Sequence, residues 1–292
     1  MIKKHVVMLS SGVGSAVAAK KVADRFGLDN MVCLFADVGE HEDNYRFLLD
    51  IQRAWDLPIT IITNDGKTIW DVFKESRFLG NSRVDPCSRM LKREPMRAWL
   101  EQNFEPEDTV VHIGFDVDEG HRMAKAAPHW VPWEIQAPLC WEGLEVFKHE
   151  AIALINDWAI EAPLLTRQGF AHANCGGGCI KAGHKQFRKL YELHPDTYAD
   201  WEKNETEVAV FLGKDVSILK NRRGGVTKPL TLRGLREEIN TGVRPQEDEG
   251  WGSCNCMGID VGEYEKPVRP DTPTTVEGFD NVRDYLLERS SL

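Results

Sequence analysis

The chain has 292 residues, of which 42% are hydrophobic and 28% are charged, and its mean hydropathy is −0.39. This composition is ordinary for a folded globular protein and excludes collagen-like and disordered chains. No apolar run approaches the ~18 residues that a membrane-spanning helix needs, and the apolar stretch after Lys3 and Lys4 is too short for a signal peptide. We therefore expect a cytoplasmic protein with no membrane association.

The balance of charges makes the whole chain an unpromising nucleic-acid binder. It has 36 basic and 46 acidic residues, a net charge of −10 and an isoelectric point near 5.5. Seven cysteines, an odd number, argue against a disulfide scaffold in a reducing compartment. Four of them form two pairs, Cys175 and Cys179 in NCGGGC and Cys254 and Cys256 in SCNC. Paired thiols in such a compartment favour a metal site.

The first half of the chain predicts strands that alternate with helices. Apolar runs predict strands at 5–9, 31–35, 58–62 and 109–114, and helical spacing predicts helices at 16–26, 44–55 and 85–100. Gly27 supplies a stop for the first helix. This alternation is typical of an α/β fold with a doubly wound, mainly parallel sheet. Ligands of such sheets bind beyond the carboxyl ends of the strands.

The loop between the first strand and the first helix is the first candidate site. It consists of Ser10, Ser11, Gly12, Val13, Gly14 and Ser15. Glycines allow close approach of the backbone to an anion, and the following helix offers free N–H groups and a favourable dipole. The loop matches neither the Walker pattern nor the dinucleotide-binding pattern. A plain glycine-rich turn remains the alternative.

Three further segments place polar residues near strand ends. Segment 36–48 carries Asp37, segment 85–100 carries Cys87, Lys92 and Arg93, and segment 113–122 ends in Arg122. In the last segment, the polar side chains are Asp116, Asp118, Glu119, His121 and Arg122. We expect all three to face one cleft.

Taken in order, these segments resemble the adenine-nucleotide α-hydrolase (PP-loop) superfamily, in its phosphoadenosine-phosphosulfate reductase-like branch. The resemblance covers roughly residues 5–140 and implies a HUP-like fold. It implies that the loop 10–15 binds phosphates of ATP, AMP or a related adenine nucleotide and that Asp37 contacts adenosine. It also implies catalytic roles for Lys92, Arg122 and Cys87, with Mg²⁺ as a further candidate cofactor.

Two departures from the family pattern shape the functional expectation. Gly14 stands where many ATP pyrophosphatases have Asp, and the Glu-Cys-Gly-Leu-His segment of the sulfate reductases is not found in this sequence. We expect attack on the α-phosphate of ATP, with adenylylation and pyrophosphate release, linked to sulfur transfer or nucleic-acid modification. The alternatives are a phosphosulfate-nucleotide reductase or sulfotransferase, and a non-catalytic nucleotide-binding accessory protein of a nucleic-acid-associated system.

Residues 141–292 predict a helical, coil-rich subdomain after a nucleotide-binding domain at 1–140. Helices are expected at 149–160 and from Ile180 onward. The four thiolates of Cys175, Cys179, Cys254 and Cys256 would complete a tetrahedral zinc site or hold an iron–sulfur cluster. The resemblance favours [4Fe–4S], because several branches of the superfamily carry it. Unligated thiols in small-residue turns are the alternative.

Segment 213–236 reverses the overall charge. It has one acidic residue, Asp215, and seven basic ones: Lys214, Lys220, Arg222, Arg223, Lys228, Arg233 and Arg236. Such a cluster is typical of a surface that contacts the phosphates of a nucleic acid or nucleotide. A solvated face that balances nearby acidic segments is the alternative.

Overall fold

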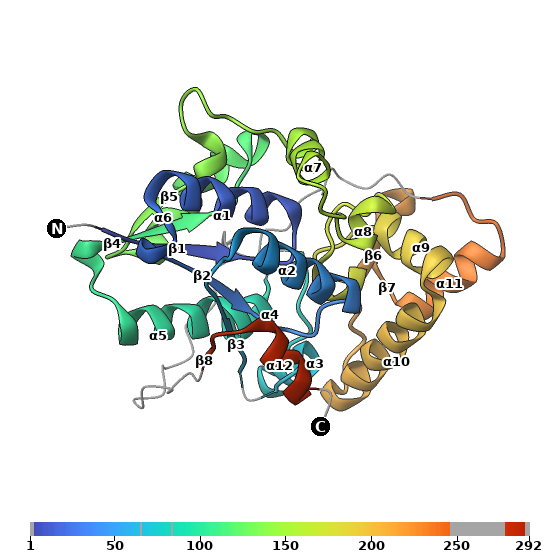
Figure 1. Cartoon of the computed structure of the whole chain (residues 1–292). Coiled ribbons are helices and arrows are strands. Elements are labelled where there is room, and N and C mark those ends of the chain that lie inside the picture. Colours follow the sequence, from blue (N-terminus) through green and yellow to red (C-terminus); the bar gives the residue numbers. More distant parts are fainter. Residues whose placement is uncertain (1–2, 65, 83, 246–277, 290–292) are drawn as a thin grey trace.

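The computed structural model describes residues 3–64, 66–82, 84–245 and 278–289 (Figure 1). Its centre is a six-stranded sheet in the order β5-β4-β1-β2-β3-β8. The strands are β1 (Lys4–Leu9), β2 (Met31–Ala36), β3 (Ile59–Ile62), β4 (Thr109–Ile113), β5 (Glu134–Gln136) and β8 (Gly278–Phe279). Every neighbouring pair is parallel except β3–β8, which is antiparallel. The predicted α/β fold with a mainly parallel sheet is confirmed.

The strand order contains a reversal beside β1. The chain runs from β1 through β2 to β3 on one side and then crosses to β4 and β5 on the other. β1 and β4 are therefore neighbours, with Met8 opposite Ile113 near their carboxyl ends. The connections that follow them leave in opposite directions, and ligands of open α/β sheets bind in the crevice at such a reversal.

Helices cover both faces of the sheet (Figure 1). One face packs against α1 (Val13–Phe26), α2 (Glu42–Trp55), α7 (Lys148–Asp157) and α12 (Val282–Arg289), and the other against α5 (Glu94–Asn103) and α6 (Met123–Trp130). Alternate strand residues serve the two cores, since Val7 and Leu9 belong to the first and Val6 and Met8 to the second. Because both faces are buried, the strands are apolar at nearly every position.

A further hydrophobic core lies at the end of the sheet that α9, α10 and α11 occupy in Figure 1. It is built by α3 (Ile69–Glu75), α9 (His184–Leu193), α10 (Pro195–Leu212), α11 (Leu232–Asn240) and the hairpin of β6 (Leu219–Asn221) and β7 (Lys228–Leu230). Trp70 of α3 packs edge-on against Trp201 of α10, with ring centroids 4.8 Å apart. Residues from both sides of position 140 build this core and the core under α1, since α3 joins the former while α7 and α12 join the latter. The core under α5 and α6 contains only residues up to 140.

Two predicted helices differ in detail from the structure. Segment 85–100 is interrupted by a π-helical turn at Arg89–Arg93, between α4 (Pro86–Ser88) and α5. The helix expected from Ile180 begins instead at His184, because Gly183 before it is extended (φ −90°, ψ −177°). Among the described residues, no helix is both long enough and apolar enough to cross a membrane.

A buried histidine in β4 makes stability depend on pH. His112 is 0% exposed, its Nε2 lies 2.9 Å from Nδ1 of His5, and its Nδ1 has no partner among the described residues. Burial lowers the pKa of His112 to about 3. In the unfolded chain this histidine binds a proton below pH ~6.5, whereas in the folded chain it stays neutral down to a pH of about 3. Its contribution to the free energy of unfolding is therefore greatest above pH ~6.5 and falls as the pH drops from there toward about 3.

We expect wild-type protein to lose about 2 kcal/mol of stability between pH ~7 and ~5 from this residue. His112→Phe, which does not titrate, should show a smaller loss over the same range in urea unfolding followed by circular dichroism. His121→Gln, at an exposed position, is the control and should retain the wild-type difference. An undiminished difference in His112→Phe would show that other groups carry the acid sensitivity.

Candidate functional site

A pocket of about 180 Å³ lies at the carboxyl ends of β1 and β4, where the strand order reverses. The loop expected to bind phosphate supplies Ser10, Gly12, Val13, Gly14 and Ser15 to its lining. Lys92 and the loop after β4, also named as candidates from the sequence, line the same pocket. Ser11 is buried beside it and accepts a hydrogen bond from Asn44 Nδ2 (2.8 Å). Five of the six residues of the loop 10–15 thus line one pocket together with Lys92.

The loop is folded around the hydroxyl of Ser15. The Ser10 N–H donates to Ser15 Oγ (3.0 Å), which lies 2.7 Å from the carbonyl oxygen of Ser10 and 2.9 Å from that of Gly12. Gly12 is the N-cap of α1 and has no side chain to cap it. The first N–H groups of a helix have no intrahelical acceptor, so those of Val13 and Gly14 remain available to an anion in the pocket.

Gly114, directly after β4, lets that strand approach the loop closely. A Cβ at Gly114 would lie 2.7 Å from Cα of Ser15 and 3.0 Å from its nitrogen. Real Cβ atoms do not come this near to backbone, and backbone on both sides leaves little room to yield. The close contact between the end of β4 and the loop 10–15 therefore requires a glycine at position 114.

We expect Gly114→Ala to lower the free energy of unfolding by roughly 2–3 kcal/mol, as overpacking of a close contact does. Gly120→Ala is the matched control, because a Cβ there would meet only Cys140 Sγ at 3.5 Å. Urea unfolding of both variants compares them. If Gly114→Ala and Gly120→Ala had equal free energies of unfolding, the end of β4 and the loop 10–15 could move apart without loss of stability.

Lys92 brings positive charge to the pocket. It is 7% exposed, and its Nζ lies 3.4 Å from Oε1 of Glu40. Lys148 of α7 also lines the pocket and donates to the carbonyl of Ala171 (2.7 Å). Asp116 and Glu119 add carboxylates to the same lining. The site therefore combines cations suited to phosphate with carboxylates suited to a divalent cation.

The other predicted catalytic residues lie outside this lining. Arg122 donates a hydrogen bond to Oε1 of Glu119 (2.8 Å), which itself lines the pocket. Cys87 is 9% exposed within the core built by the C-terminal helices. Arg93, the basic neighbour of Lys92 in the sequence, also lies outside the lining, in a buried ion pair 3.4 Å from Asp85. Of the three residues to which the resemblance gives catalytic roles, only Lys92 lines the pocket.

Asp37, predicted to contact adenosine, is engaged with the C-terminal helix. Its Oδ1 accepts from the N–H of Gly39 (2.9 Å) and the hydroxyl of Tyr45 (2.7 Å). Its Oδ2 accepts from the hydroxyl of Tyr285 and lies 3.5 Å from a guanidinium nitrogen of Arg289, both on α12. Asp37 is not among the residues that line the pocket.

The first cysteine pair comes together beside the pocket. Cys175, Gly176 and Gly177 are all left-handed (φ +53°, +63° and +90°), which turns the chain back on itself. A hydrogen bond with the thiol of Cys179, together with burial, raises the pKa of Cys175 well above its ordinary value. The two sulfurs are therefore neighbours, as two ligands of one metal must be.

The second pair, Cys254 and Cys256, lies outside the described residues. In the part of the chain that the structure describes, no three His, Cys, Asp or Glu side chains gather as a metal site. Cys175 and Cys179 fit half of a four-thiolate site for zinc or [4Fe–4S]. Completion of that site depends on residues beyond those described.

Sequence reasoning missed several neighbours of the pocket. Asn44 donates to Ser11 Oγ (2.8 Å) and to the carbonyl of Ala173 (3.3 Å), and so joins the phosphate loop to the segment before the cysteines. His172 lines the pocket, and burial together with Lys148 and Lys92 lowers its pKa to about 4. A neutral imidazole therefore faces the ligand space. In the sequence, Asn44 falls within the candidate segment 36–48, but nothing there showed that it would contact Ser11.

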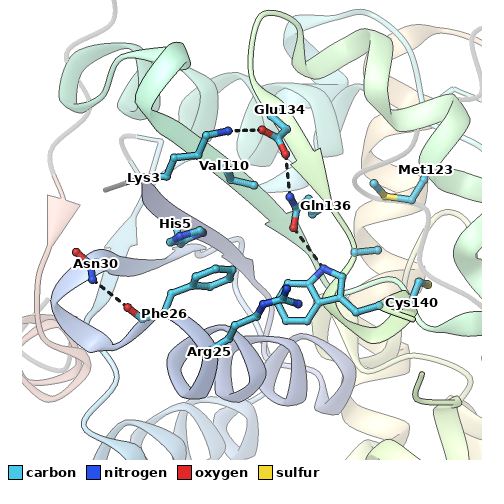
Figure 2. Close-up of a pocket in the computed structure, with 12 residues that line it drawn as sticks. Lys3, His5, Arg25, Phe26, Asn30, Val110, Met123, Glu134, Gln136 and Cys140 are labelled. Atoms are coloured by element: carbon cyan, nitrogen blue, oxygen red, sulfur yellow. Dashed lines mark hydrogen bonds and ion pairs between the residues drawn. The ribbon is translucent and has the colours of Figure 1, made fainter. Parts of the chain in front are cut away.

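A larger cavity, about 780 Å³, opens beside the first residues of β1 and β4 and along β5 (Figure 2). The guanidinium of Arg25 lies over Trp141 (4.6 Å), and Lys3 pairs with Glu134 (2.6 Å) along its wall. None of the predicted site residues that the structure describes lines it. It lies at the amino ends of β1 and β4, away from the crevice at the reversal of the strand order, so we place the candidate site in the smaller pocket.

The basic segment 213–236 is partly neutralised. Arg223 makes a two-pronged contact with Glu238 of α11. Arg233 and Arg236 both pair with Glu202 of α10. Residues 222–229, at the tip of the β6–β7 hairpin, are exposed. The positive surface is therefore smaller than seven basic residues suggest.

Neither protein-family models nor curated proteins match this chain. Its function is accordingly inferred from the residues of the pocket.

Proposed function

We propose that this protein is an adenine-nucleotide-binding enzyme of the PP-loop, phosphoadenosine-phosphosulfate reductase-like kind, acting at the α-phosphate of ATP. One observation carries the proposal. The loop 10–15, the start of α1, Lys92 and the loop after β4 line a single pocket at the reversal of the strand order. This combination of backbone donors and a buried cation suits a chain of phosphates.

In the proposed reaction, a nucleophile on an acceptor attacks the α-phosphorus and the bond to the β-phosphate oxygen breaks. The acceptor becomes adenylylated and pyrophosphate leaves with the electron pair. N–H groups of α1 and the ammonium of Lys92 stabilise the charge that grows on pyrophosphate. Arg122 acts through Glu119, which with Asp116 would hold Mg²⁺. Displacement of AMP by sulfur, or modification of a nucleic acid, would follow.

The size of the pocket limits which part of the nucleotide it holds. Drug-sized ligands fill sites of about 300–1,000 Å³, and this pocket has about 180 Å³. We infer that it receives the phosphates while adenosine lies outside, toward Asp37. For adenosine to contact Asp37, the carboxylate must accept from it in addition to Tyr285 and Arg289, or must release one of them.

Mass spectrometry of AMP and pyrophosphate, with ATP and a panel of thiol, carboxylate and nucleic-acid acceptors, tests the proposal. Pyrophosphate and adenylylated acceptor in equal amounts, with AMP released only when a second nucleophile displaces it, would support the proposal. Lys92→Ala should weaken binding of pyrophosphate more than of adenosine, since it removes charge rather than shape. Failure of all acceptors together with failure to bind pyrophosphate would refute the proposal.

A non-catalytic, nucleotide-binding accessory role is the second candidate. It is favoured by Gly14, which lines the pocket where many ATP pyrophosphatases have Asp. A Cβ at Gly14 would meet the carbonyl oxygen of Gly114 at 3.4 Å, a tight but tolerable contact. Tight binding of ATP without turnover, and turnover restored by Gly14→Asp, would favour this candidate. Turnover with phosphosulfate nucleotides would instead favour a reductase or sulfotransferase.

The thiol pair would contribute two ligands to a [4Fe–4S] cluster or zinc, with Cys254 and Cys256 as the proposed remainder. A cluster would supply redox or sulfur chemistry, whereas zinc would only hold the chain together. For nucleic acid, the exposed hairpin tip with Arg222 and Lys228 is the proposed contact. A steep loss of affinity with rising salt would support that contact.

A further inference from the structure

Glu40 is a buried carboxylate that touches both halves of the site. Its side chain is 1% exposed and lies in the loop between β2 and α2. Oε1 lies 3.4 Å from Nζ of Lys92, and Oε2 accepts a hydrogen bond from the N–H of Cys175 (2.8 Å). The N–H of Glu40 donates to the hydroxyl of Tyr45 (3.0 Å), which fixes the loop. One carboxyl group thus joins the cation of the pocket to the thiol pair.

The segment 171–179, here called the cysteine loop, is also a wall of the pocket. Its first four residues, 171–174, line the pocket, and its last five carry both thiols. Cys175 is left-handed (φ +53°), a conformation that costs free energy in a residue other than glycine. The hydrogen bond to Glu40 helps to hold this turn. Movement of the Glu40 carboxylate would therefore shift the backbone at Cys175 and with it the positions of the two thiols.

We propose that Glu40 is a positioning residue that couples anion binding at Lys92 to the cysteine loop. The inference rests on the proposed function, because it takes the ligand at Lys92 to be a phosphate-bearing anion. Such an anion competes with Glu40 for the ammonium of Lys92. A carboxylate that gives up part of a cation is a stronger acceptor for its other donors, so the hydrogen bond from Cys175 tightens.

The coupling must act in both directions. If an anion at Lys92 tightens the cysteine loop, then a ligand that orders the loop favours the anion by the same factor. Glu40 would therefore link occupancy of the thiol pair to occupancy of the pocket. Such coupling gives a physical reason for the thiol pair to lie beside the pocket.

Asp43 offers a matched control on the same segment. Like Glu40, it joins a cation to a distant backbone, since it pairs with Arg46 (2.7 Å) and accepts from the N–H of Leu164 (2.5 Å). It does not line the pocket. Asp43→Asn therefore repeats the chemical change of Glu40→Gln without touching Lys92.

Calorimetric titration of the full chain with inorganic pyrophosphate measures the first half of the coupling. Glu40→Gln removes the negative charge that competes for Lys92, and we expect about tenfold tighter binding. Asp43→Asn should bind like wild type. A residue with only a structural role would weaken binding when replaced, so the direction of the change is diagnostic.

Hydrogen exchange at the Cys175 amide, resolved by fragmentation mass spectrometry, measures the second half. In wild type, saturating pyrophosphate should slow this exchange about threefold or more, because the hydrogen bond to Glu40 tightens. In Glu40→Gln the ligand should have no such effect, whereas Asp43→Asn should retain it. If Glu40→Gln fails to fold, Glu40→Asp keeps the charge but is too short to reach both partners, and should also abolish the ligand effect.

The outcomes separate this inference from the proposed function. Absence of pyrophosphate binding in wild type would overturn both. Binding in wild type with unchanged or weaker binding in Glu40→Gln would overturn the coupling alone. So would ligand-dependent slowing at Cys175 that persists in Glu40→Gln, because protection would then come from direct cover by the ligand.

Discussion

Gly12→Val should abolish binding of pyrophosphate and ATP, with at least a hundredfold loss of affinity, or about 3 kcal/mol, while the fold remains intact. Gly12 has an ordinary backbone conformation (φ −104°, ψ 154°), and a Cβ there would meet only Ser10 Oγ at 3.4 Å. A Cβ therefore fits there without strain, and the side chain of Val extends from it. It would project from a residue that lines the pocket and separate the anion from the N–H groups of α1.

Titration calorimetry of Gly12→Val measures the loss, and Gly12→Ala grades it, since a single methyl group should cost less. Thermal unfolding of both variants should stay within a few degrees of wild type. Retained affinity in Gly12→Val would reduce the loop 10–15 to a plain turn. A collapse of stability would show instead that the loop has no room for a side chain.

Cys179→Ser should remove bound metal almost completely from protein purified without oxygen. A serine hydroxyl is a far poorer ligand than a thiolate for zinc or iron, and Cys179 lies beside Cys175 in the cysteine loop. Metal analysis and absorbance spectra give the result. A cluster would add a broad brown absorbance that oxygen bleaches, whereas zinc would leave the protein colourless and stable in air.

Cys140→Ser is the control, because that thiol lies 3.4 Å from the carbonyl oxygen of Asp116 and apart from the thiol pair. It should keep wild-type metal content. Full metal content in Cys179→Ser would show that the NCGGGC thiols are not ligands. Wild-type protein without metal under these conditions would favour the alternative of unligated thiols.

The parallel strands could be predicted because burial on both faces makes each of them a continuous apolar run. The predicted strand 31–35 corresponds to β2 at Met31–Ala36, and the predicted strand 109–114 to β4 at Thr109–Ile113. β8 has two residues, Gly278 and Phe279, too few to show any periodicity. In α12, only Val282 and Tyr285 are buried, so its sequence reads as a charged surface.

The candidate site could be predicted where its residues share one loop. The loop 10–15 follows β1 directly, so its place at the strand end followed from local sequence. Glu40 could not be assigned a role in this way, because its partners Lys92 and Cys175 lie 52 and 135 residues away. The engagement of Asp37 by Tyr285 is equally remote, at 248 residues. Such contacts depend on tertiary packing, which short motifs do not encode.

The antiparallel β8 has a consequence for how copies of this protein behave together. It covers the outer edge of β3, and Thr60 bonds across to Asp280 (3.0 Å). Gly278 is required there, since a Cβ would come within 2.8 Å of Thr60. A chain shortened before Gly278 would leave β3 with unpaired backbone groups, a template for edge-to-edge aggregation. We therefore expect a chain shortened before Gly278 to aggregate more readily than the full chain.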